Sequence, residues 1–369
     1  MRASLAVVTF LLCMTLAAWA EEADDPAALN EAERDPNIQN KVENSIRRGC
    51  QWLARNQNKD GGLKSQYAVA ATGLAGLAWL ASGSTPEAGP YANNIRRAID
   101  FTIRSQGSSG FITEGSGYGN SSMYGHGFSA LFLAEAYGMT RDEEVAGRLK
   151  QAVIKAIRLI ESTQNQFGGW NGTPDARQTD DGSGAVAIMQ ISALRAAESC
   201  GIHVKQQVVE KAKKYLLAMT SPSGWYAYNW GSRSQGGEDQ GRAGTTGPGI
   251  YMLGAMNLHT DPKYEKGIKN LMKTCPFLTG GAGRGGTGQW YWFYYTCFYA
   301  SLAIYQHGGA EWAKWYPAMV TSLVNRQRPD GSFEDEYGGV YTALGVLSLS
   351  IAYRYLPMFQ EGAAGREGR

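Results

Sequence analysis

The sequence predicts an all-α protein, a single barrel in which six inner helices are surrounded by six outer helices. Three observations predict this architecture. A glycine-rich turn recurs six times, a helix with one apolar stripe precedes each turn, and a helix that is apolar nearly all round follows it. The 369 residues would also allow two domains, but a regular repeat is a better guide to domain number than length.

The six turns share glycine next to an aromatic or apolar residue. They contain Asp60-Gly61-Gly62-Leu63, Gln106-Gly107-Ser108-Ser109-Gly110-Phe111, Phe167-Gly168-Gly169-Trp170, Ser223-Gly224-Trp225, Gly285-Gly286-Thr287 with Trp290, and Asp330-Gly331-Ser332-Phe333. A helix pair with its connections requires the observed spacing of about 45 to 60 residues, and the fifth turn fits least well. Because every turn leads from an outer to an inner helix, we expect the turns to gather at one end of the barrel.

The helices before the turns are amphipathic. In the first of them, steps of four, four and three residues separate Val42, Ile46, Cys50 and Leu53. Apolar residues between 145 and 160 follow the same pattern, and charged or amide side chains lie between them. Such a helix buries one face and exposes the other to water, as an outer helix would.

The helices after the turns lack a polar face. Examples are the segments 67–81, 127–139, 185–197 and 340–353. A helix of this kind must be enclosed on all sides. A single helix pair cannot bury these faces, whereas stacking the pairs and closing the ring does so. A solenoid that does not close is the alternative architecture.

The ends of the chain have a different character from the repeats. A basic start, an apolar run over residues 5–18 and the small-x-small sequence Ala18-Trp19-Ala20 predict a signal peptide over residues 1–20. Residues 21–37 are expected to form an acidic lead-in, and the composition of residues 359–369 predicts a disordered tail. We therefore expect an exported protein, periplasmic or extracellular, without a transmembrane segment.

Charge and cysteine content limit the binding partners and the metal or disulfide sites that we expect. The formal net charge is +2 and no Lys/Arg stripe is present, so nucleic acid is not an expected partner. Four cysteines follow the signal peptide, and none forms the Cys-x-x-Cys pair of a zinc knuckle. We expect single buried thiols, although Cys275 and Cys297 both belong to the turn end, where export would permit a disulfide.

The turn motifs resemble the repeats of squalene cyclases and of the protein prenyltransferase β subunit, over about residues 40–356. The segments 124–127 (Tyr-Gly-His-Gly), 133–139 and 353–357 are similar to exported bacterial proteins called prenyltransferase or squalene-oxidase repeat proteins. The resemblance implies an α/α toroid over residues 38–358, a transferase or cyclase-like enzyme, and an apolar isoprenoid ligand. A shared fold implies shape more strongly than reaction.

The inner helices begin at the turn end, where their free N–H groups favour anions. Before the third of them, Gln178-Thr179-Asp180-Asp181 resembles the Asp-x-Asp-Asp motif of squalene-type cyclases, whose middle aspartate protonates an alkene. Asp180 falls on that position, so the resemblance implies Asp180 and Asp181 as catalytic residues, although Gln178 replaces the first aspartate. Helix capping and ligand binding without proton transfer are the alternatives.

Residues 290–299, rich in Trp, Tyr and Phe, are similar to a prenyltransferase β segment in which a histidine binds zinc. Tyr295 stands in place of that histidine, and residues 245–248 lack the family's Asp-x-Cys, so we expect neither metal nor cofactor. Trp292 and Tyr295, with Tyr341 of the sixth inner helix, are predicted to line an aromatic ligand cavity. Ordinary core packing is the alternative.

Two further segments supply candidate ligand-binding residues. His126 lies between two glycines at the start of the second inner helix, close to Tyr124, and is either a ligand contact or a hydrogen-bonded structural histidine. The long glycine-rich connection 221–249 carries Trp230 and Glu238, and long connections of this kind often cover a site.

Three functions stay open from the sequence. The first is binding or acid-catalysed conversion of an isoprenoid in an aromatic cavity. The second is a non-catalytic toroid that holds an apolar ligand or a partner protein. The third is a glycan-active toroid, a lyase or hydrolase, in which Asp180 or Asp181 works with Glu238 across an aromatic groove.

Overall fold

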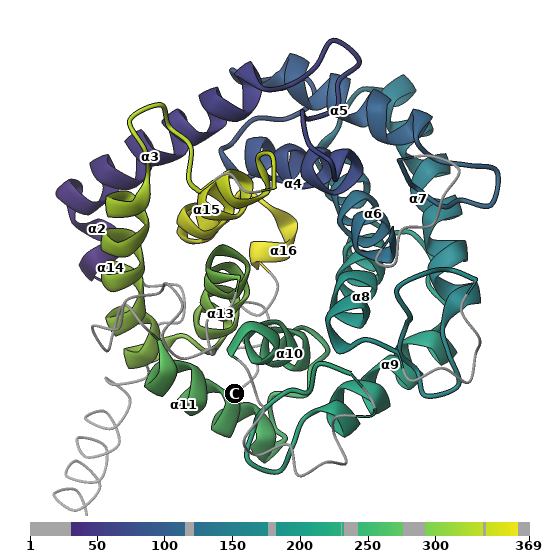
Figure 1. Ribbon diagram of the computed structural model, residues 1–369, viewed down its shortest axis with the longest axis vertical. Helices are drawn as coiled ribbons and strands as arrows, with labels where there is room; N and C mark the ends of the chain where they lie inside the picture. The colour runs from purple at the N-terminus through teal and green to yellow at the C-terminus, as the bar shows by residue number, and fades with distance from the viewer. Residues whose placement is uncertain are drawn as a thin grey trace, which may run out of the picture.

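The structure is a computed structural model, and it describes residues 31–114, 122–175, 182–229, 231, 243–275, 292–334 and 337–360. Its described elements form two concentric rings of helices (Figure 1). The inner ring contains α4 (Ala68–Ala81), α6 (Ser122–Met139), α8 (Gly184–Ser199), α10 (Ala243–Ala255), α13 (Phe293–His307) and α15 (Val340–Ser350). The outer ring contains α3 (Pro36–Arg55), α5 (Ala92–Arg104), α7 (Glu143–Thr163), α9 (Gln206–Met219), α11 (Pro262–Thr274) and α14 (Gly309–Arg326).

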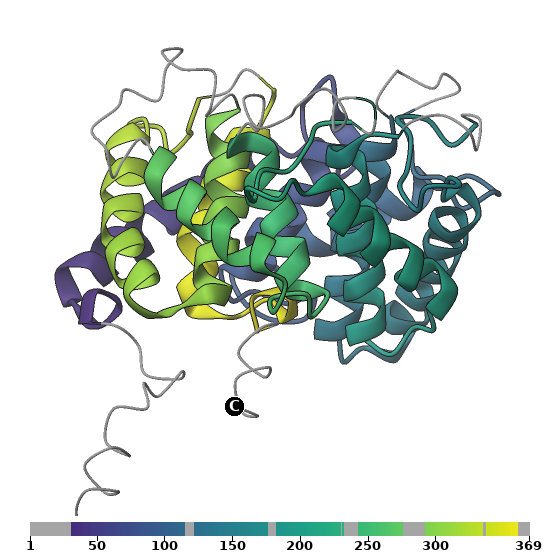
Figure 2. The same cartoon turned by 90° about the horizontal axis from the view of Figure 1, so that it is seen from below.

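The inner ring is closed. Each inner helix contacts the next one, and the last, α15, contacts the first, α4. The prediction of an all-α toroid with six inner and six outer helices is therefore confirmed for the part of the chain that the structure describes, and the open solenoid is not formed. Figure 2 shows that the connections from outer to inner helices lie together along one edge, which we call the turn end.

The core fills the space between the two rings. The outer helix α3 buries the stripe expected from its spacing: Val42, Ile46, Cys50 and Leu53. The inner helix α4 buries nearly every side chain, including Leu74, Leu77 and Trp79, because other helices surround it. One-sided and all-round apolar patterns thus sort the helices into the outer and inner rings.

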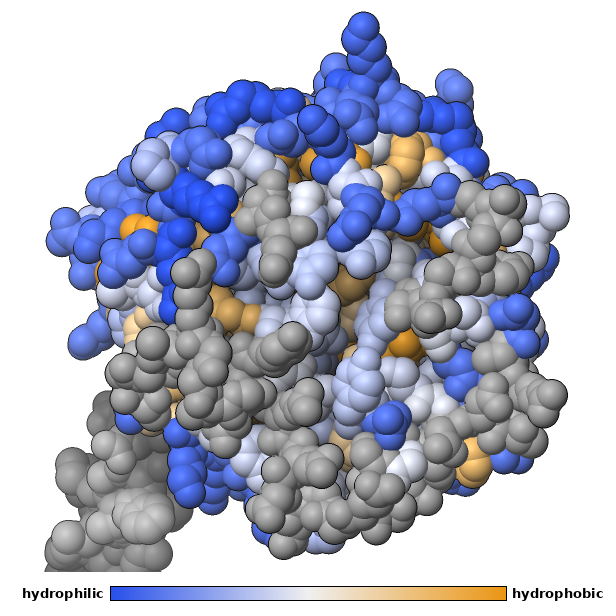
Figure 3. Space-filling model, viewed as in Figure 1, coloured by the Kyte–Doolittle hydropathy of each residue, from blue (hydrophilic) through white to orange (hydrophobic). Residues whose placement is uncertain are grey.

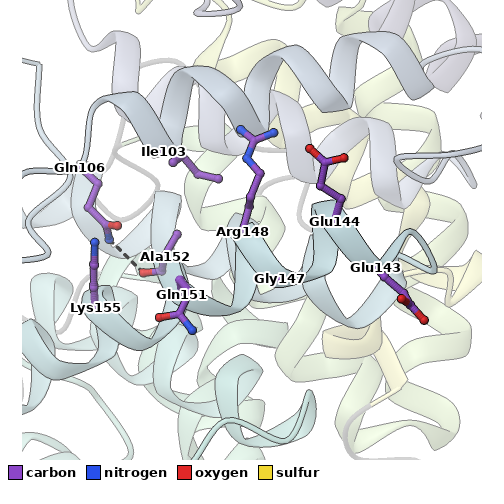
Figure 4. Close-up of a pocket in the computed structure, with 9 residues that line it drawn as sticks. All are labelled: Ile103, Gln106, Glu143, Glu144, Gly147, Arg148, Gln151, Ala152 and Lys155. Atoms are coloured by element: carbon purple, nitrogen blue, oxygen red, sulfur yellow. Dashed lines mark hydrogen bonds between the residues drawn. The ribbon is translucent and has the colours of Figure 1, made fainter.

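Each turn is fixed to the outer helix of the next repeat by a glutamine. The side-chain nitrogen of Gln57 donates hydrogen bonds to Gly61 O in its own turn, at 2.8 Å, and to Asn94 O on α5, at 3.0 Å. Gln106 and Gln164 repeat this pair of bonds toward α7 and α9. Figure 4 shows the bond from Gln106 to α7. Each glutamine therefore joins two consecutive repeats.

The same contact closes the ring. Gln327, after α14, donates to Gly331 O at 3.0 Å and to Ser45 O on α3 at 2.9 Å, and the Ser45 hydroxyl donates back to it at 2.8 Å. Gly331 has a φ of +96°, and a Cβ atom there would lie 2.4 Å from Arg48 O. Only glycine allows the sixth turn to approach the first outer helix this closely.

The described ends of the chain pack against the rings. The short helix α2 (Glu31–Arg34) lies within the expected acidic lead-in, and Trp312 Nε1 donates to buried Glu33 at 2.6 Å. The final inner helix ends at Ser350, before a 3₁₀ turn over Ile351–Tyr353, earlier than the expected segment 340–353.

A last short helix, α16 (Pro357–Gln360), lies inside the ring at the end opposite the turns (Figures 1 and 2). Phe359 is buried there, so the chain is still packed where we expected the disordered tail to begin. Glu135, buried in α6, accepts a hydrogen bond from Met358 N at 3.4 Å. One partner of this carboxylate thus comes from α16, a helix that the sequence did not indicate.

Substitution of Gly331 tests the ring closure. Gly331→Ala should lower the free energy of unfolding by about 3 kcal/mol or more, because it adds backbone strain and a clash with Arg48 O. The matched control is Gly147→Ala, at an exposed position of α7 where nothing lies within 4 Å of the added Cβ. The control should raise stability by about 0.5–1 kcal/mol. Urea denaturation followed by circular dichroism measures both, and equal effects of the two variants would contradict the closure contact.

Candidate functional site

The structure places five of the nine predicted site residues. Tyr124, His126, Trp292, Tyr295 and Tyr341 are described, and all five lie on the first turns of inner helices or directly before them. The other four fall outside the described residues: Asp180, Asp181, Trp230 and Glu238. The geometry of the site is therefore built from the described residues of the turn end.

Exposed aromatic side chains mark the turn end. Tyr67, Tyr228 and Trp292 are 47%, 55% and 49% exposed, unusually high fractions for large rings. Tyr67 and Trp292 directly precede α4 and α13, and Tyr228 lies on the connection to α10. Three inner helices thus each bring an uncovered ring to the same end of the barrel.

Four rings form a continuous aromatic platform, by which we mean Tyr67, Trp292, Tyr337 and Tyr341. The Tyr337 ring lies 5.2 Å from Trp292 in a stacked arrangement, 5.3 Å from Tyr341 edge-on and 5.9 Å from Tyr67. A hydrogen bond of 3.0 Å from the Ser65 hydroxyl to Tyr337 O ties the first and sixth turns together. The predicted residues Trp292 and Tyr341 are brought together through Tyr337, which the sequence analysis missed.

Trp292 adopts an unusual backbone conformation. Its φ is +63°, in the left-handed region that non-glycine residues seldom occupy. The strain costs about 1–2 kcal/mol, and it holds the indole against Tyr337 rather than in the core. Strain of this kind is common at functional sites, and here it keeps a large ring half-exposed.

Three tyrosines form a second group, the phenol floor, made of Tyr124, Tyr228 and Tyr295. Tyr295 is the third residue of α13, so it lies about one helical turn further in than Trp292. The hydroxyls of Ser183 and Tyr228 are the side-chain neighbours that influence the Tyr124 hydroxyl. Burial, reinforced by the neighbouring phenols, raises the pKa of Tyr124 and of Tyr295 above their ordinary value. Their hydroxyls are therefore neutral donors and acceptors at physiological pH.

One carboxylate that the sequence analysis missed lies at this end. Glu114, in the second turn, accepts a hydrogen bond from Val69 N at the start of α4, at 2.5 Å. Tyr67 provides no side-chain cap for that helix, so Glu114 supplies one from the neighbouring repeat. Burial raises the pKa of Glu114, and the hydrogen bond from Val69 partly opposes the shift. Glu114 lies three residues after Phe111, the apolar residue of the turn, and this position could have indicated it from the sequence.

The segment after Asp181 is paired with the segment before Trp230. Gly184 N donates to Tyr228 O at 2.7 Å, and Ser183 forms an antiparallel bridge with Asn229. Ser183 is the N-cap of α8, its hydroxyl accepting a 3.4 Å hydrogen bond from Val186 N. The phenol floor thus adjoins the chain that follows Asp181.

His126 is a wall residue, by which we mean a buried structural residue of the inner ring. It is fully buried, and its Nδ1 accepts a hydrogen bond from Ile112 N in the second turn at 3.2 Å. In other repeats a threonine hydroxyl accepts the equivalent bond, donated by the second residue after the turn glycine: Thr72 from Leu63, Thr246 from Tyr226 and Thr342 from Phe333. Of the two roles considered for His126, the geometry supports the structural one, because a buried ring that fixes a turn has no surface to offer a ligand.

The described residues offer little for metal or disulfide chemistry. They contain no group of three or more His, Cys, Asp or Glu side chains that could hold a metal ion. Cys275 and Cys297 do not form the disulfide that the turn end would have permitted. Burial raises the pKa of the Cys50 and Cys297 thiols to about 12, so both are inert core groups. No helix in the described part of the chain is long and apolar enough to cross a membrane.

The face at the turn end is hollowed at its centre (Figure 3). Among the coloured residues of this view, pale and orange ones of intermediate or apolar character border the hollow, and hydrophilic ones predominate on the outer rim. A separate groove of about 470 Å³ opens on the outer wall between α5 and α7, lined largely by polar and charged side chains such as Glu144 and Arg148 (Figure 4). The aromatic rings that gather at the turn end make this hollowed face the candidate ligand site.

The closed double ring defines the chain as an α/α toroid. No protein-family model and no curated protein matches it. Among solved structures, it is similar to the type II terpene cyclase MstE from Scytonema, a variant in complex with geranylgeranyl dihydroxybenzoate, with a TM-score of 0.55. The identity is 16%, and the match covers 87% of this chain and 99% of the cyclase.

A second group of similar structures acts on glycans. The GH76A α-1,6-mannanase of Salegentibacter sp. HEL1_6 has a TM-score of 0.61 and 12% identity, covering 84% of this chain and 98% of the mannanase. An inactive variant of it, with two consecutive aspartates replaced, holds α-1,6-mannotetrose, at a TM-score of 0.59, 12% identity, and coverage of 85% and 99%. Identities this low establish the shared fold and leave the chemistry to the site itself.

His126 gives a testable pH dependence. Burial lowers its pKa from 6.5 to about 4, and the backbone carbonyl of Ala156 partly opposes the shift. The unfolded chain therefore takes up a proton first as the pH falls. The stability associated with neutral His126 is complete above about pH 6.5, and about 3 kcal/mol of it is lost toward pH 4.

His126→Asn keeps an acceptor near the Nδ1 position but cannot titrate. Its free energy of unfolding should fall by about 3 kcal/mol less than that of the parent protein between pH 6.5 and 4. The control is His203→Asn at an exposed position, which should retain the parent pH profile. Parallel urea denaturation series at stepped pH measure the difference, and identical profiles for His126→Asn and the parent would refute the role of His126.

Proposed function

We propose that this chain binds a glycan in the hollow at its turn end and that Asp180 and Asp181 act on it. The observation that carries the proposal is the aromatic platform, whose rings Tyr67 and Trp292 are each about half exposed. A sugar ring presents a face of C–H groups that packs on an aromatic face, while its hydroxyls need polar partners. The platform offers the first and the phenol floor offers the second.

The catalytic part of the proposal rests on consecutive aspartates. Asp180 and Asp181 directly precede Gly182, and the chain from Ser183 is bridged to Asn229 beside the phenol floor. Glycoside hydrolysis uses two carboxyl groups, one as an acid and one as a base or nucleophile. The similar mannanase was inactivated by replacing two consecutive aspartates. We assign the acid and base roles to Asp180 and Asp181, with Glu238 as an alternative partner.

A second candidate is an isoprenoid ligand, protonated by Asp180 or simply held. It is favoured by the aromatic contacts that continue from the platform into the wall, where Tyr294 lies 5.1 Å from Tyr341 and 5.6 Å from Phe333. The similar terpene cyclase was solved with a geranylgeranyl substrate. Ring faces suit an isoprenoid chain, but the neutral phenols of the floor provide hydrogen bonds that such a chain cannot use, and we therefore place the glycan first.

Substitution of Trp292 tests glycan binding. Trp292→Ala should weaken binding by about 30-fold or more, because a central aromatic contact contributes about 2 kcal/mol or more. The matched control is Tyr355→Ala, which removes a ring that is 50% exposed and lies beyond the 3₁₀ turn that follows α15, away from the platform. An oligosaccharide array followed by isothermal titration calorimetry measures both variants.

Binding of the parent protein to vesicles containing geranylgeraniol is measured beside the oligosaccharide array. The comparison distinguishes glycan binding from isoprenoid binding. Binding of the parent protein to the isoprenoid and to no oligosaccharide would replace the first proposal by the second. Equal glycan affinity of Trp292→Ala and Tyr355→Ala would remove the platform from the site.

The two aspartates are tested by activity and affinity together. Asp180→Asn and Asp181→Asn should each lower the release of reducing sugar by about 100-fold or more while leaving glycan affinity within a few-fold of the parent. Asp175→Asn, five residues before Asp180, is the matched control and should retain full activity. Full activity in both aspartate variants would overturn their assignment, and affinity lost together with activity would make them binding residues.

A further inference from the structure

The hydroxyl of Tyr295 is buried without a hydrogen-bond partner among the described residues. Leaving a buried hydroxyl unsatisfied costs about 1–3 kcal/mol, and native proteins usually avoid this cost. A phenylalanine at position 295 would keep the ring and remove the cost. The unpaired hydroxyl therefore points to a partner that the described part of the chain does not supply.

The Tyr295 side chain keeps a little exposed surface, although it projects from an inner helix and its hydroxyl is buried. Tyr124, on α6, interacts electrostatically with it, and α6 and α13 lie on opposite sides of the inner ring (Figure 1). The phenol floor therefore connects opposite sides of the inner ring at the turn end.

The surroundings of this hydroxyl are uncharged. After burial itself, the largest influences on Tyr295 come from tyrosines: Tyr299, whose ring centroid lies 4.9 Å away, Tyr124, Tyr226 and Tyr228. The Ser183 hydroxyl is a further uncharged neighbour of Tyr124. No Lys, Arg or His is among the main influences on Tyr124 and Tyr295, so the described part of the floor presents no cation to balance a carboxylate or a sulfate.

We propose that the phenol floor is the subsite for the uncharged, hydroxyl-bearing end of the ligand, and that Tyr295 is its specificity-determining contact. The inference rests on the proposed glycan function and narrows it to neutral sugars. The aromatic platform holds a sugar ring at the rim, and the terminal sugar extends inward to the floor. A hydroxyl of that sugar pairs with the hydroxyl of Tyr295, which is otherwise unsatisfied, whereas an acidic sugar would bury an unbalanced charge.

Tyr295→Phe separates this role from a structural one. In the free protein, the variant should melt at the same or a higher temperature than the parent, because it removes an unsatisfied buried hydroxyl. Its affinity for neutral oligosaccharides should fall by about 3- to 10-fold, the loss expected for one hydrogen bond. A structural role would instead lower the melting temperature and leave the affinity unchanged.

Tyr299→Phe is the matched control. Tyr299 lies one helical turn further along α13, and its hydroxyl already contacts Met189 Sδ at 3.4 Å. Removing that hydroxyl should lower the melting temperature slightly, or leave it unchanged, and should leave glycan affinity at the parent value. Differential scanning calorimetry measures the free proteins.

The affinity probes are an array of neutral oligosaccharides that includes α-1,6-mannotriose, printed beside uronic-acid and sulfated oligosaccharides. We expect the parent protein to prefer the neutral set and Tyr295→Phe to reduce that preference. A preference for acidic oligosaccharides, or unchanged affinity in Tyr295→Phe, would overturn this inference while leaving the proposed function in place. Absence of any glycan binding by the parent would overturn the proposed function and this inference together.

Discussion

The contact of each glycine turn with the outer helix of the following repeat is the constraint on which the rest of this structure depends. In four described turns a glutamine side chain bridges its own turn and the next outer helix, and the bridge from Gln327 to Ser45 closes the ring. The turn glycines Gly61, Gly110, Gly168 and Gly331 all have positive φ and lie against that helix. Because the sixth repeat contacts the first in the same way as earlier repeats contact their neighbours, the ring closes without a different kind of contact.

The same constraint creates the site. Holding every described turn at one end brings the starts of the inner helices together around the axis (Figure 2). Tyr67, Trp292 and Tyr337 are far apart in the sequence, but their rings form one surface because the first repeat adjoins the last. The opposite end has a different structure, because α16 lies inside the ring there and Met358 N donates a hydrogen bond to Glu135. The toroid therefore has one end at which aromatic rings gather and one end occupied by its own C-terminal helix.

Part of the site was available from the sequence. The aromatic density of residues 290–299 and the position of residues directly before inner helices indicated Trp292, Tyr295 and Tyr124. The four-residue interval from Gln57 to Gly61, repeated at Gln106, Gln164 and Gln327, was also visible and would have indicated the contacts between repeats. His126 would have been identified as a wall residue by aligning it with Thr72 and Thr342, but the varying turn lengths conceal that equivalence.

The sequence by itself determined the helices, their division into two rings and the end at which a site would form, because these follow from periodicity and from turns that recur along the chain. Tertiary structure alone decided which rings meet, that the floor consists of neutral phenols, and that Tyr295 keeps an unsatisfied hydroxyl. The physical reason is that helix formation is encoded locally, whereas a closed ring brings its first and last repeats side by side, a proximity that no local pattern records.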